Sequence, residues 1–167
     1  MGINKWSMFY TREVTSMDNA IDFNQKIALL KKQACFSQFS QEETETLANL
    51  LVEKYYTPSQ TIVTEGDRVD SVYLIVKGTA DVRHIFIKDN ALHTESVATL
   101  SAGNAIGLND SGFYSLSGLR TATVVAITDM VLLYLSVAVF HGFALAHSHV
   151  SEIMRKNASA ILNDIPP

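Results

Sequence analysis

The chain has 167 residues, of which 47% are hydrophobic and 18% charged, a composition typical of a folded domain and unlike that of a disordered protein. Its 17 acidic and 13 basic side chains give a formal net charge of −4 without a dense basic cluster, which argues against a nucleic-acid partner. The single cysteine, Cys35, excludes an intrachain disulfide and a thiolate-rich metal site, so we expect a reducing compartment, the cytoplasm.

The N-terminal part of the chain predicts an arm followed by two helices. Residues 1–17 show no clear period and are interpreted as the arm. From Asp18 to Ala34 apolar residues recur at alternating steps of three and four, which predicts a helix with one apolar face. Ser40 and Glu43 form a capping box for a second helix, which we expect to end before Pro58.

Beyond Pro58 the pattern changes to short β-rich runs separated by turn residues. Six runs are predicted as strands: QTIVTEGD, SVYLIVKG, TADVRHIFI, HTESVATL, RTATVVAI and MVLLYLS. The polar segment LNDSGFYSLSG, residues 108–118, is expected to be irregular. Short strands with helices only at the ends predict a mainly β fold with flanking α-helices, a closed or double-sheet, jelly-roll-like β-roll.

The C-terminal part contains an uncharged run, Met130–Val150, that is long enough to span a bilayer. Ser136 divides this run into a β-rich half and an alanine-rich half that carries histidines, so we predict a buried strand followed by a serine-capped helix and no membrane span. A single helix is expected over Val137–Leu162, which gives a domain over 18–162 and a frayed end at 163–167. The histidines lack a carboxylate or cysteine that would complete a metal site.

An ordered series of motifs carries a resemblance to a known family. The motifs are FSQFSQEETETLANLL, IVTEGDRVDSVYLIVKGTADV, ATLSAGNAIG and LRTATVVAITDMVLLYLS. Between about Leu29 and Met154 the chain resembles the cyclic nucleotide-binding domains of catabolite activators, kinase regulatory subunits and nucleotide-gated channels.

The resemblance implies a phosphate-binding cassette for a cyclic nucleotide, cAMP or cGMP. By position, Gly107 is similar to the family's cassette glycine and Arg120 to its phosphate-binding arginine, and Thr121 and Ala122 occupy the small positions that follow. Where the family has a glutamate for the ribose 2′-hydroxyl, this chain has Leu108, so the cassette is interpreted as degenerate.

Two questions about this cassette stay open at the level of sequence. Asp110 is a candidate substitute for the missing ribose acceptor. Because an unpaired charge beside a core is costly, the guanidinium of Arg120 either binds a phosphate, pairs with Asp110 or another cassette acid, or is exposed to solvent at the start of the strand.

The sequence shows no catalytic triad, phosphate-binding loop or paired carboxylates, so we expect a non-catalytic protein without a cofactor. The first functional hypothesis is a regulatory module that binds a cyclic nucleotide weakly. It would signal through an unidentified protein partner or self-association, using the N-terminal arm or the C-terminal helix. The alternative is a degenerate fold that no longer binds nucleotide and acts as a protein-interaction or assembly subunit.

Overall fold

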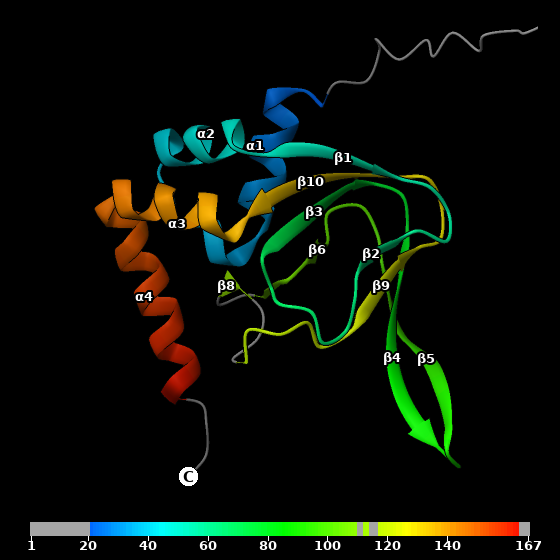
Figure 1. The fold of residues 1–167 in the computed structure, drawn as a ribbon. Coiled ribbons are helices and arrows are strands. Elements are labelled where there is room, and N and C mark those ends of the chain that lie inside the picture. The colour runs from blue at the N-terminus through cyan, green and yellow to red at the C-terminus, as the bar shows by residue number, and fades with distance from the viewer. Residues whose placement is uncertain (1–20, 110–111, 114–116, 164–167) are drawn as a thin grey trace, which may run out of the picture.

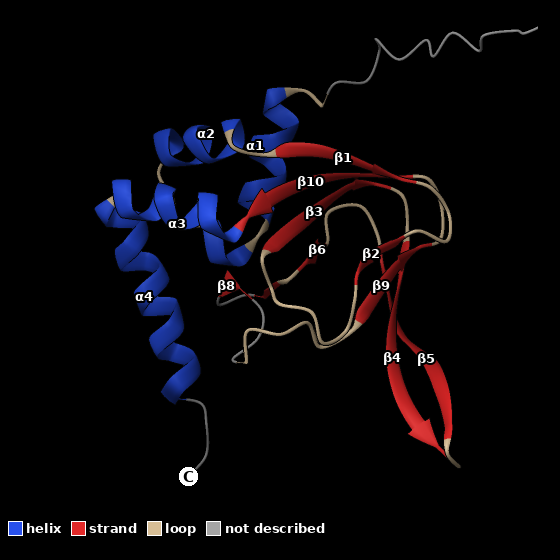
Figure 2. Cartoon of the chain, in the orientation of Figure 1, coloured by secondary structure: helices blue, strands red, loops and turns tan. Residues whose placement is uncertain are grey.

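The computed structural model describes residues 21–109, 112–113 and 117–163. Two antiparallel sheets form its centre, and helices from both ends of the chain gather on one side of them (Figures 1 and 2). This arrangement confirms the predicted mainly β fold with flanking helices in its double-sheet form, and the sheets do not close into a barrel. The predicted arm over 1–17 lies outside the described residues.

The N-terminal helices begin where the sequence supplies caps. They are α1 (Phe23–Lys32), the short 3₁₀ helix η1 (Ala34–Phe36) and α2 (Gln41–Asn49). The Asp22 carboxylate accepts the Asn24 N–H at the start of α1. At the start of α2, Ser40 Oγ accepts the Glu43 N–H and the Glu43 carboxylate accepts the Ser40 N–H, which confirms the predicted capping box.

A strand that the sequence pattern did not reveal follows α2. The helix ends at Asn49, before Pro58 as expected, and β1 (Val52–Tyr56) then pairs with the distant strand β10 (Met130–Ser136). Strand β1 was not predicted because strand pairing depends on a partner far along the chain, whereas helical spacing is a local signal.

The remaining strands build the two sheets. They are β2 (Thr61–Val63), β3 (Ser71–Lys77), β4 (Ala80–Lys88), β5 (Ala91–Leu100), β6 (Ala105–Ile106), β7 (Leu108–Asn109), β8 (Gly112–Phe113) and β9 (Thr123–Ala126). One sheet has the order β1-β10-β3-β6 and the other β2-β9-β4-β5, while β7 and β8 pair separately. Each of the six predicted runs therefore contains a strand.

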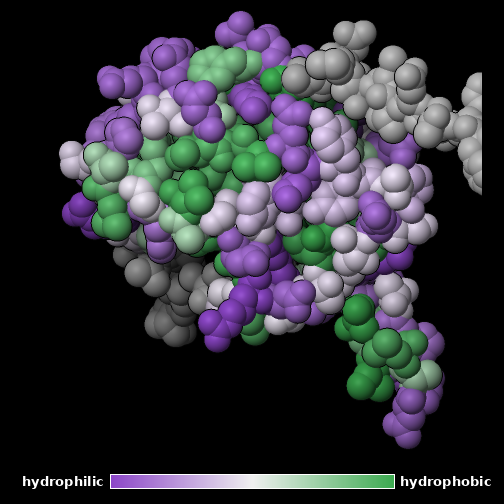
Figure 3. All heavy atoms as spheres, turned by 45° about the horizontal axis from the view of Figure 1, so that its top comes forward, coloured by the Kyte–Doolittle hydropathy of each residue, from purple (hydrophilic) through white to green (hydrophobic). Residues whose placement is uncertain are grey.

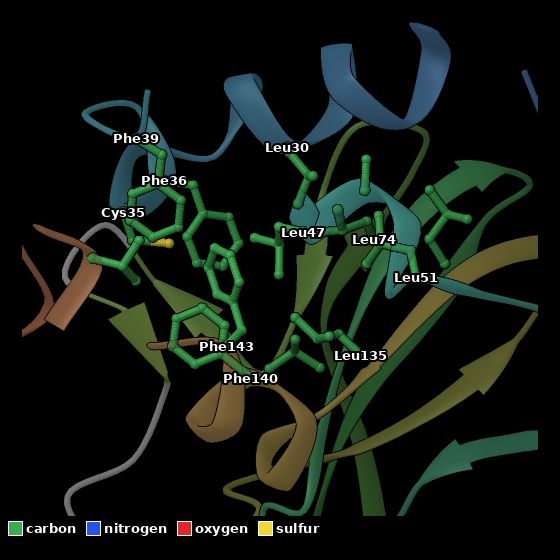
Figure 4. Close-up of a cluster of buried hydrophobic side chains, with 14 of the residues drawn as sticks. Leu30, Cys35, Phe36, Phe39, Leu47, Leu51, Leu74, Leu135, Phe140 and Phe143 are labelled. Carbon is green, nitrogen blue, oxygen red and sulfur yellow. The ribbon is translucent and has the colours of Figure 1, made fainter. Parts of the chain in front are cut away.

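Strand β3 is buried on both faces because it separates two apolar clusters. Val72 and Leu74 pack into the helical cluster, formed by Leu30, Cys35, Phe36, Phe39, Leu47, Ala48, Leu51, Val72, Leu74, Leu133, Leu135, Phe140, Phe143, Val150 and Ile153. Tyr73 and Ile75 pack into the roll cluster, formed by Ile62, Tyr73, Ile75, Ala80, Ile106, Val124, Ala126, Met130 and Leu132. Figure 4 shows the helical cluster, in which the rings of Phe36 from η1 and Phe140 from α3 meet beside the leucines of the N-terminal helices and the sheet.

The C-terminal segment forms two helices instead of the single one predicted. They are α3 (Val137–Ala146) and α4 (Ser148–Asn163), and Ser136 caps α3 as expected. The break lies at His147, whose backbone is extended (φ −126°, ψ 96°) and whose N–H donates to the Ala144 carbonyl. Its ring Nδ1 lies 2.8 Å from the Phe143 carbonyl oxygen, so an imidazole satisfies a helix end that no glycine or proline marks. Among the described residues no helix is long and apolar enough to cross a membrane.

Candidate functional site

A cavity of about 260 Å³ opens into the roll between the two sheets. Its walls come from strands β2, β4, β5, β6, β7 and β9 and from the loops beside them. The lining residues are Val63, Val69, Val82, His84, Val97, Leu100, Ala105, Ile106, Gly107, Leu108, Arg120, Thr121, Ala122 and Val124. All five site residues predicted from the sequence, Gly107, Leu108, Arg120, Thr121 and Ala122, therefore line one cavity.

The backbone of Arg120 is held by the turn that follows β2. The Arg120 N–H donates to the Asp67 carbonyl at 2.7 Å, and the Arg120 carbonyl accepts the Gly66 N–H at 2.9 Å. Gly66 has φ +88°, a conformation that favours glycine. The Glu65-Gly66-Asp67 turn in the sequence thus serves to fix the position of an arginine more than fifty residues later.

The Arg120 guanidinium is anchored on one side only. Its Nη2 donates to the Ser71 carbonyl at 2.8 Å and to Ser71 Oγ at 3.1 Å, and lies 3.5 Å from Asp70 Oδ1. Arg120 is only 7% exposed, and its Nη1 has no hydrogen-bond partner, the one such buried side-chain nitrogen or oxygen in the part of the chain that the structure describes. A buried donor without a partner costs about 1–3 kcal/mol, so an acceptor from outside the protein would gain by binding there.

Gly107 lies directly against this unpaired nitrogen. A Cβ atom at residue 107 would be 2.8 Å from Arg120 Nη1 and 3.2 Å from the Ser71 carbonyl oxygen, and φ is +84°. A side chain is therefore excluded both by the backbone conformation and by the guanidinium. The absence of a side chain brings the backbone of residue 107 next to a positive charge at the cavity wall.

The comparisons with known proteins identify the family of this fold. The model of the cyclic nucleotide-binding domain matches residues 53–147, which is more than half of the chain. The chain belongs to the cyclic nucleotide-binding domain family. The lining residues of the cavity all fall between Val63 and Val124, so the match includes the whole cavity wall.

The relatives of this cyclic nucleotide-binding domain include regulatory subunits of protein kinases. The chain is 27% identical over 123 residues to a cAMP-dependent protein kinase regulatory subunit of Eremothecium gossypii, which covers 74% of this chain and 24% of that protein. The chain spans about a quarter or less of the length of the curated relatives it matches.

Solved structures with the same fold come from a transcriptional regulator and from a protein kinase regulatory subunit. The N-terminal domain of a transcriptional regulator from Streptomyces coelicolor A3(2) superposes with a TM-score of 0.67 at 20% identity, covering 81% of this chain and 90% of that one. The regulatory subunit of a cAMP-independent protein kinase A from Trypanosoma brucei gives a TM-score of 0.59 at 20% identity, covering 82% of this chain and 47% of that one. At this identity the likeness shows the fold.

The other predicted site residues of the domain lie at the edge of the cavity. Leu108 is half-buried and also packs against the helical cluster. Thr121 is exposed and Ala122 half-buried. Asp110, the candidate substitute acceptor and candidate partner of Arg120, lies outside the described residues.

Three site residues were missed by the sequence analysis. Asp70 and Ser71 are the partners of the Arg120 side chain, and His84 contributes an imidazole to the cavity wall. The Nδ1 of His84 lies 3.5 Å from Glu65 Oε1, and Glu65 Oε2 accepts the Ile85 N–H at 2.9 Å. These contacts join residues distant in the chain, so no local spacing reveals them, although Asp70 and Ser71 do mark the polar start of a strand.

Proposed function

We propose that this chain is a non-catalytic regulatory module that binds a cyclic nucleotide, cAMP or cGMP, in the cavity beside Arg120. In this proposal the phosphate accepts hydrogen bonds from Arg120 Nη1 and lies against the backbone of Gly107, with Thr121 and Ala122 at its edge. The observation that carries the proposal is the buried guanidinium, which is anchored to Ser71 on one side and unpaired on the side facing Gly107. An arginine in this state fits a phosphate, which offers several strong acceptor oxygens.

We expect the affinity to be weak. Leu108 stands where a charged acceptor for the ribose would be needed, and a hydrogen bond to a charged group is worth about 1.5–3 kcal/mol. Its loss weakens binding about 10- to 100-fold. The domain would pass the signal on through a protein partner or through self-association.

Calorimetric titration of the full chain with cAMP and with cGMP tests the proposal. Arg120→Ala should cost about 2–3 kcal/mol of binding, a loss of roughly 30- to 150-fold in affinity. Arg83→Ala is the matched control, because Arg83 lies on β4, bonds Asp81 through its Nε and is not part of the cavity wall. An Arg120→Lys variant keeps the positive charge but loses the planar guanidinium that can bond two phosphate oxygens, so it should bind the nucleotide more weakly than wild type. This variant provides the test in the case that Arg120→Ala folds poorly.

Unchanged nucleotide affinity in a folded Arg120→Ala variant would contradict the assignment of the phosphate site. The absence of binding to wild type at millimolar nucleotide, in a protein with a cooperative melting transition, would contradict nucleotide recognition altogether.

That second outcome would favour the other candidate function, a docking or assembly module. The observation behind it is the apolar surface of the described residues. The β4–β5 hairpin projects from the roll (Figure 1), and apolar side chains are visible on the surface of the molecule (Figure 3). In this hairpin Ile87 is 76% exposed and Leu92 is 72% exposed, and Leu145 on α3 is 86% exposed. Ile87 and Leu92 are paired across the two strands, and contiguous apolar surface, unlike single exposed residues, is typical of contacts between proteins.

A further inference from the structure

The β4–β5 hairpin leaves a long strand at the edge of a sheet. Strand β5 ends the order β2-β9-β4-β5, and in the part of the chain that the structure describes it pairs only with β4. Residues 91–99 of β5 are all exposed, and the hairpin projects away from the roll with β5 on its outer side (Figure 1). Such an edge offers a row of backbone N–H and carbonyl groups to another strand.

This edge lacks the features that usually prevent strands of different molecules from pairing. Natural edge strands are often short or carry proline or lysine. Strand β5 has ten residues, and none of them is proline, glycine or lysine. Its pairing with β4 shifts only between Val82 and Arg83, opposite the end of β5 that is near the roll. The outer half of β5, residues 91–96, is therefore a regular and accessible edge.

The turn of the hairpin determines which backbone groups face this edge. Asp89 and Asn90 have φ angles of 52° and 58° and form a two-residue turn between the paired residues Lys88 and Ala91. In such a hairpin the pair beside the turn is hydrogen-bonded, and bonded pairs then alternate with unbonded ones. The N–H and carbonyl groups that point away from β4 are therefore those of Leu92, Thr94 and Ser96.

A second copy of β5 fits this edge in the antiparallel direction, and the charged side chains select the register. Because outward groups must meet outward groups, the registers that use most of the outer half are centred on His93, Thr94 or Glu95. Centring on His93 places two imidazoles opposite each other, and centring on Glu95 does the same with two carboxylates. Centring on Thr94 places His93 of each copy opposite Glu95 of the other. An imidazole donates to a carboxylate, whereas like charges in opposite positions repel.

The side chains of the outer half suit this register. The ring of His93 is stacked on Phe86 with the centroids 5.7 Å apart, so it is already ordered for a contact across the edge. His93 and Glu95 would form an unbonded pair, the kind in which cross-strand side chains lie closer together. On the other face, Leu92 of one copy would lie opposite Ser96 and diagonal to Thr94 of the second copy, which would cover part of an exposed leucine.

We propose that the outer half of β5 is a self-association surface, through which two copies of the chain pair in the antiparallel direction with Thr94 at the two-fold axis. The two β2-β9-β4-β5 sheets then form one continuous sheet. A two-fold contact uses the same edge of both copies, so the assembly closes as a dimer. The inference goes beyond the proposed function and does not depend on nucleotide binding.

Sedimentation velocity of the full chain without nucleotide tests the proposal. Because a single strand from each copy makes a small interface, we expect a dimer with a dissociation constant of about 10–100 μM. Thr94→Pro removes the outward N–H at the centre of the pair and leaves the bonds to β4 intact, so it should weaken the dimer by about 100-fold. Thr94→Val keeps the N–H and a β-branched side chain, and it should keep the wild-type dissociation constant.

A charge exchange tests the register. His93→Glu places a carboxylate opposite Glu95 of the second copy at two positions, so it should weaken the dimer by about 10-fold or more. The double variant His93→Glu/Glu95→Lys makes each pair attractive again and should restore the dimer. His93→Gln controls for the loss of the ring. His141→Glu makes the same change of charge at an exposed position of α3 and should leave the dissociation constant unchanged.

Several results would overturn the inference. Wild type that stays monomeric up to about 1 mM would exclude the dimer and leave the proposed function in place. A dimer that His93→Glu leaves intact would exclude this edge, and this variant decides the matter if Thr94→Pro folds poorly. A dimer lost only in His141→Glu would place the contact on the C-terminal helices. A double variant as weak as His93→Glu alone would exclude the register centred on Thr94.

Discussion

Both faces of the sheet β1-β10-β3-β6 carry apolar side chains, but one face is packed against helices and the other borders a cavity. On one face the helical cluster joins fifteen buried residues from helices and strands, and its phenylalanine rings lie 5.3–6.2 Å apart between centroids. On the other face the roll cluster borders a cavity of about 260 Å³ that contains a buried arginine. The comparison teaches that the strands supply apolar side chains to both faces, and that the helices close only one of them.

Leucine truncation on each face should sharpen this comparison most. Leu135 is 1% exposed within the helical cluster, so Leu135→Ala should reduce the free energy of unfolding by about 2–5 kcal/mol. Leu100 lines the cavity and is half-buried, so Leu100→Ala should cost about 1 kcal/mol. Urea unfolding of both variants measures the difference, and equal losses would show that the cavity face is as closely packed as the helical one.

Two glycine substitutions probe the cavity wall against the helical side. Gly107→Ala should reduce the free energy of unfolding by about 1–2 kcal/mol from its positive φ alone, and the new Cβ would displace the Arg120 guanidinium. Gly142 lies in α3 and is exposed, and a Cβ atom at this position would have no neighbouring atom within 4 Å. Gly142→Ala should therefore raise the free energy of unfolding by about 0.5–1 kcal/mol. Thermal melting shows whether each variant is less or more stable than wild type. A Gly107→Ala variant as stable as wild type would contradict the expected backbone strain at residue 107.

A smaller effect concerns the contact between the N- and C-terminal helices. Glu43 is 7% exposed, and both of its carboxylate oxygens lie 3.0 Å from His149 Nδ1. Burial tends to raise the pKa of Glu43, but the hydrogen bonds from the Ser40 N–H and from His149 outweigh it and lower the pKa below 4.5. A lowered folded-state pKa means that the ionised carboxylate stabilises the fold above pH 4.5 and that this stabilisation is lost as the pH falls through the folded value.

Glu43→Gln should therefore reduce the free energy of unfolding by about 1–2 kcal/mol at pH 7, and the difference from wild type should shrink as the pH falls below 4.5. Glu152→Gln is the control, because Glu152 pairs with Lys156 on the exposed side of α4 and should change stability far less. Melting curves at pH 7 and pH 3.5 measure both variants. A Glu43→Gln deficit of the same size at both pH values would assign the effect to packing instead of charge.

Much of the fold was predictable because its signals are local. The Ser40–Glu43 capping box, the six β-rich runs and the Ser136 cap each lie within a few residues of the structure they specify. Strand β1 was missed because its partner is β10, and the break at His147 was missed because an imidazole, not a glycine, ends the helix.

The candidate site divides in the same way. Gly107 and Arg120 could be located from the order of the motifs, and the structure places them in contact with one another at the cavity. The anchoring of Arg120 by Ser71 could not be predicted, because 49 residues separate the two and only the folded sheet brings them together. The same is true of His84, which lies on the wall in the strand β4 that pairs with β5.

The peptide between Asp70 and Ser71 has one more consequence. Its carbonyl, from Asp70, accepts the N–H of Val137, the first residue of α3, at 2.8 Å, while the Ser71 carbonyl next to it accepts Arg120 Nη2. Strand β10 passes into α3 at Ser136 without an intervening loop. Two successive backbone carbonyls, those of Asp70 and Ser71, therefore connect the first residue of α3 with the arginine of the cavity. In the proposed function this segment would connect a partner bound at α3 with an anion bound at Arg120, and because coupling between two sites is reciprocal, each would change the affinity of the other.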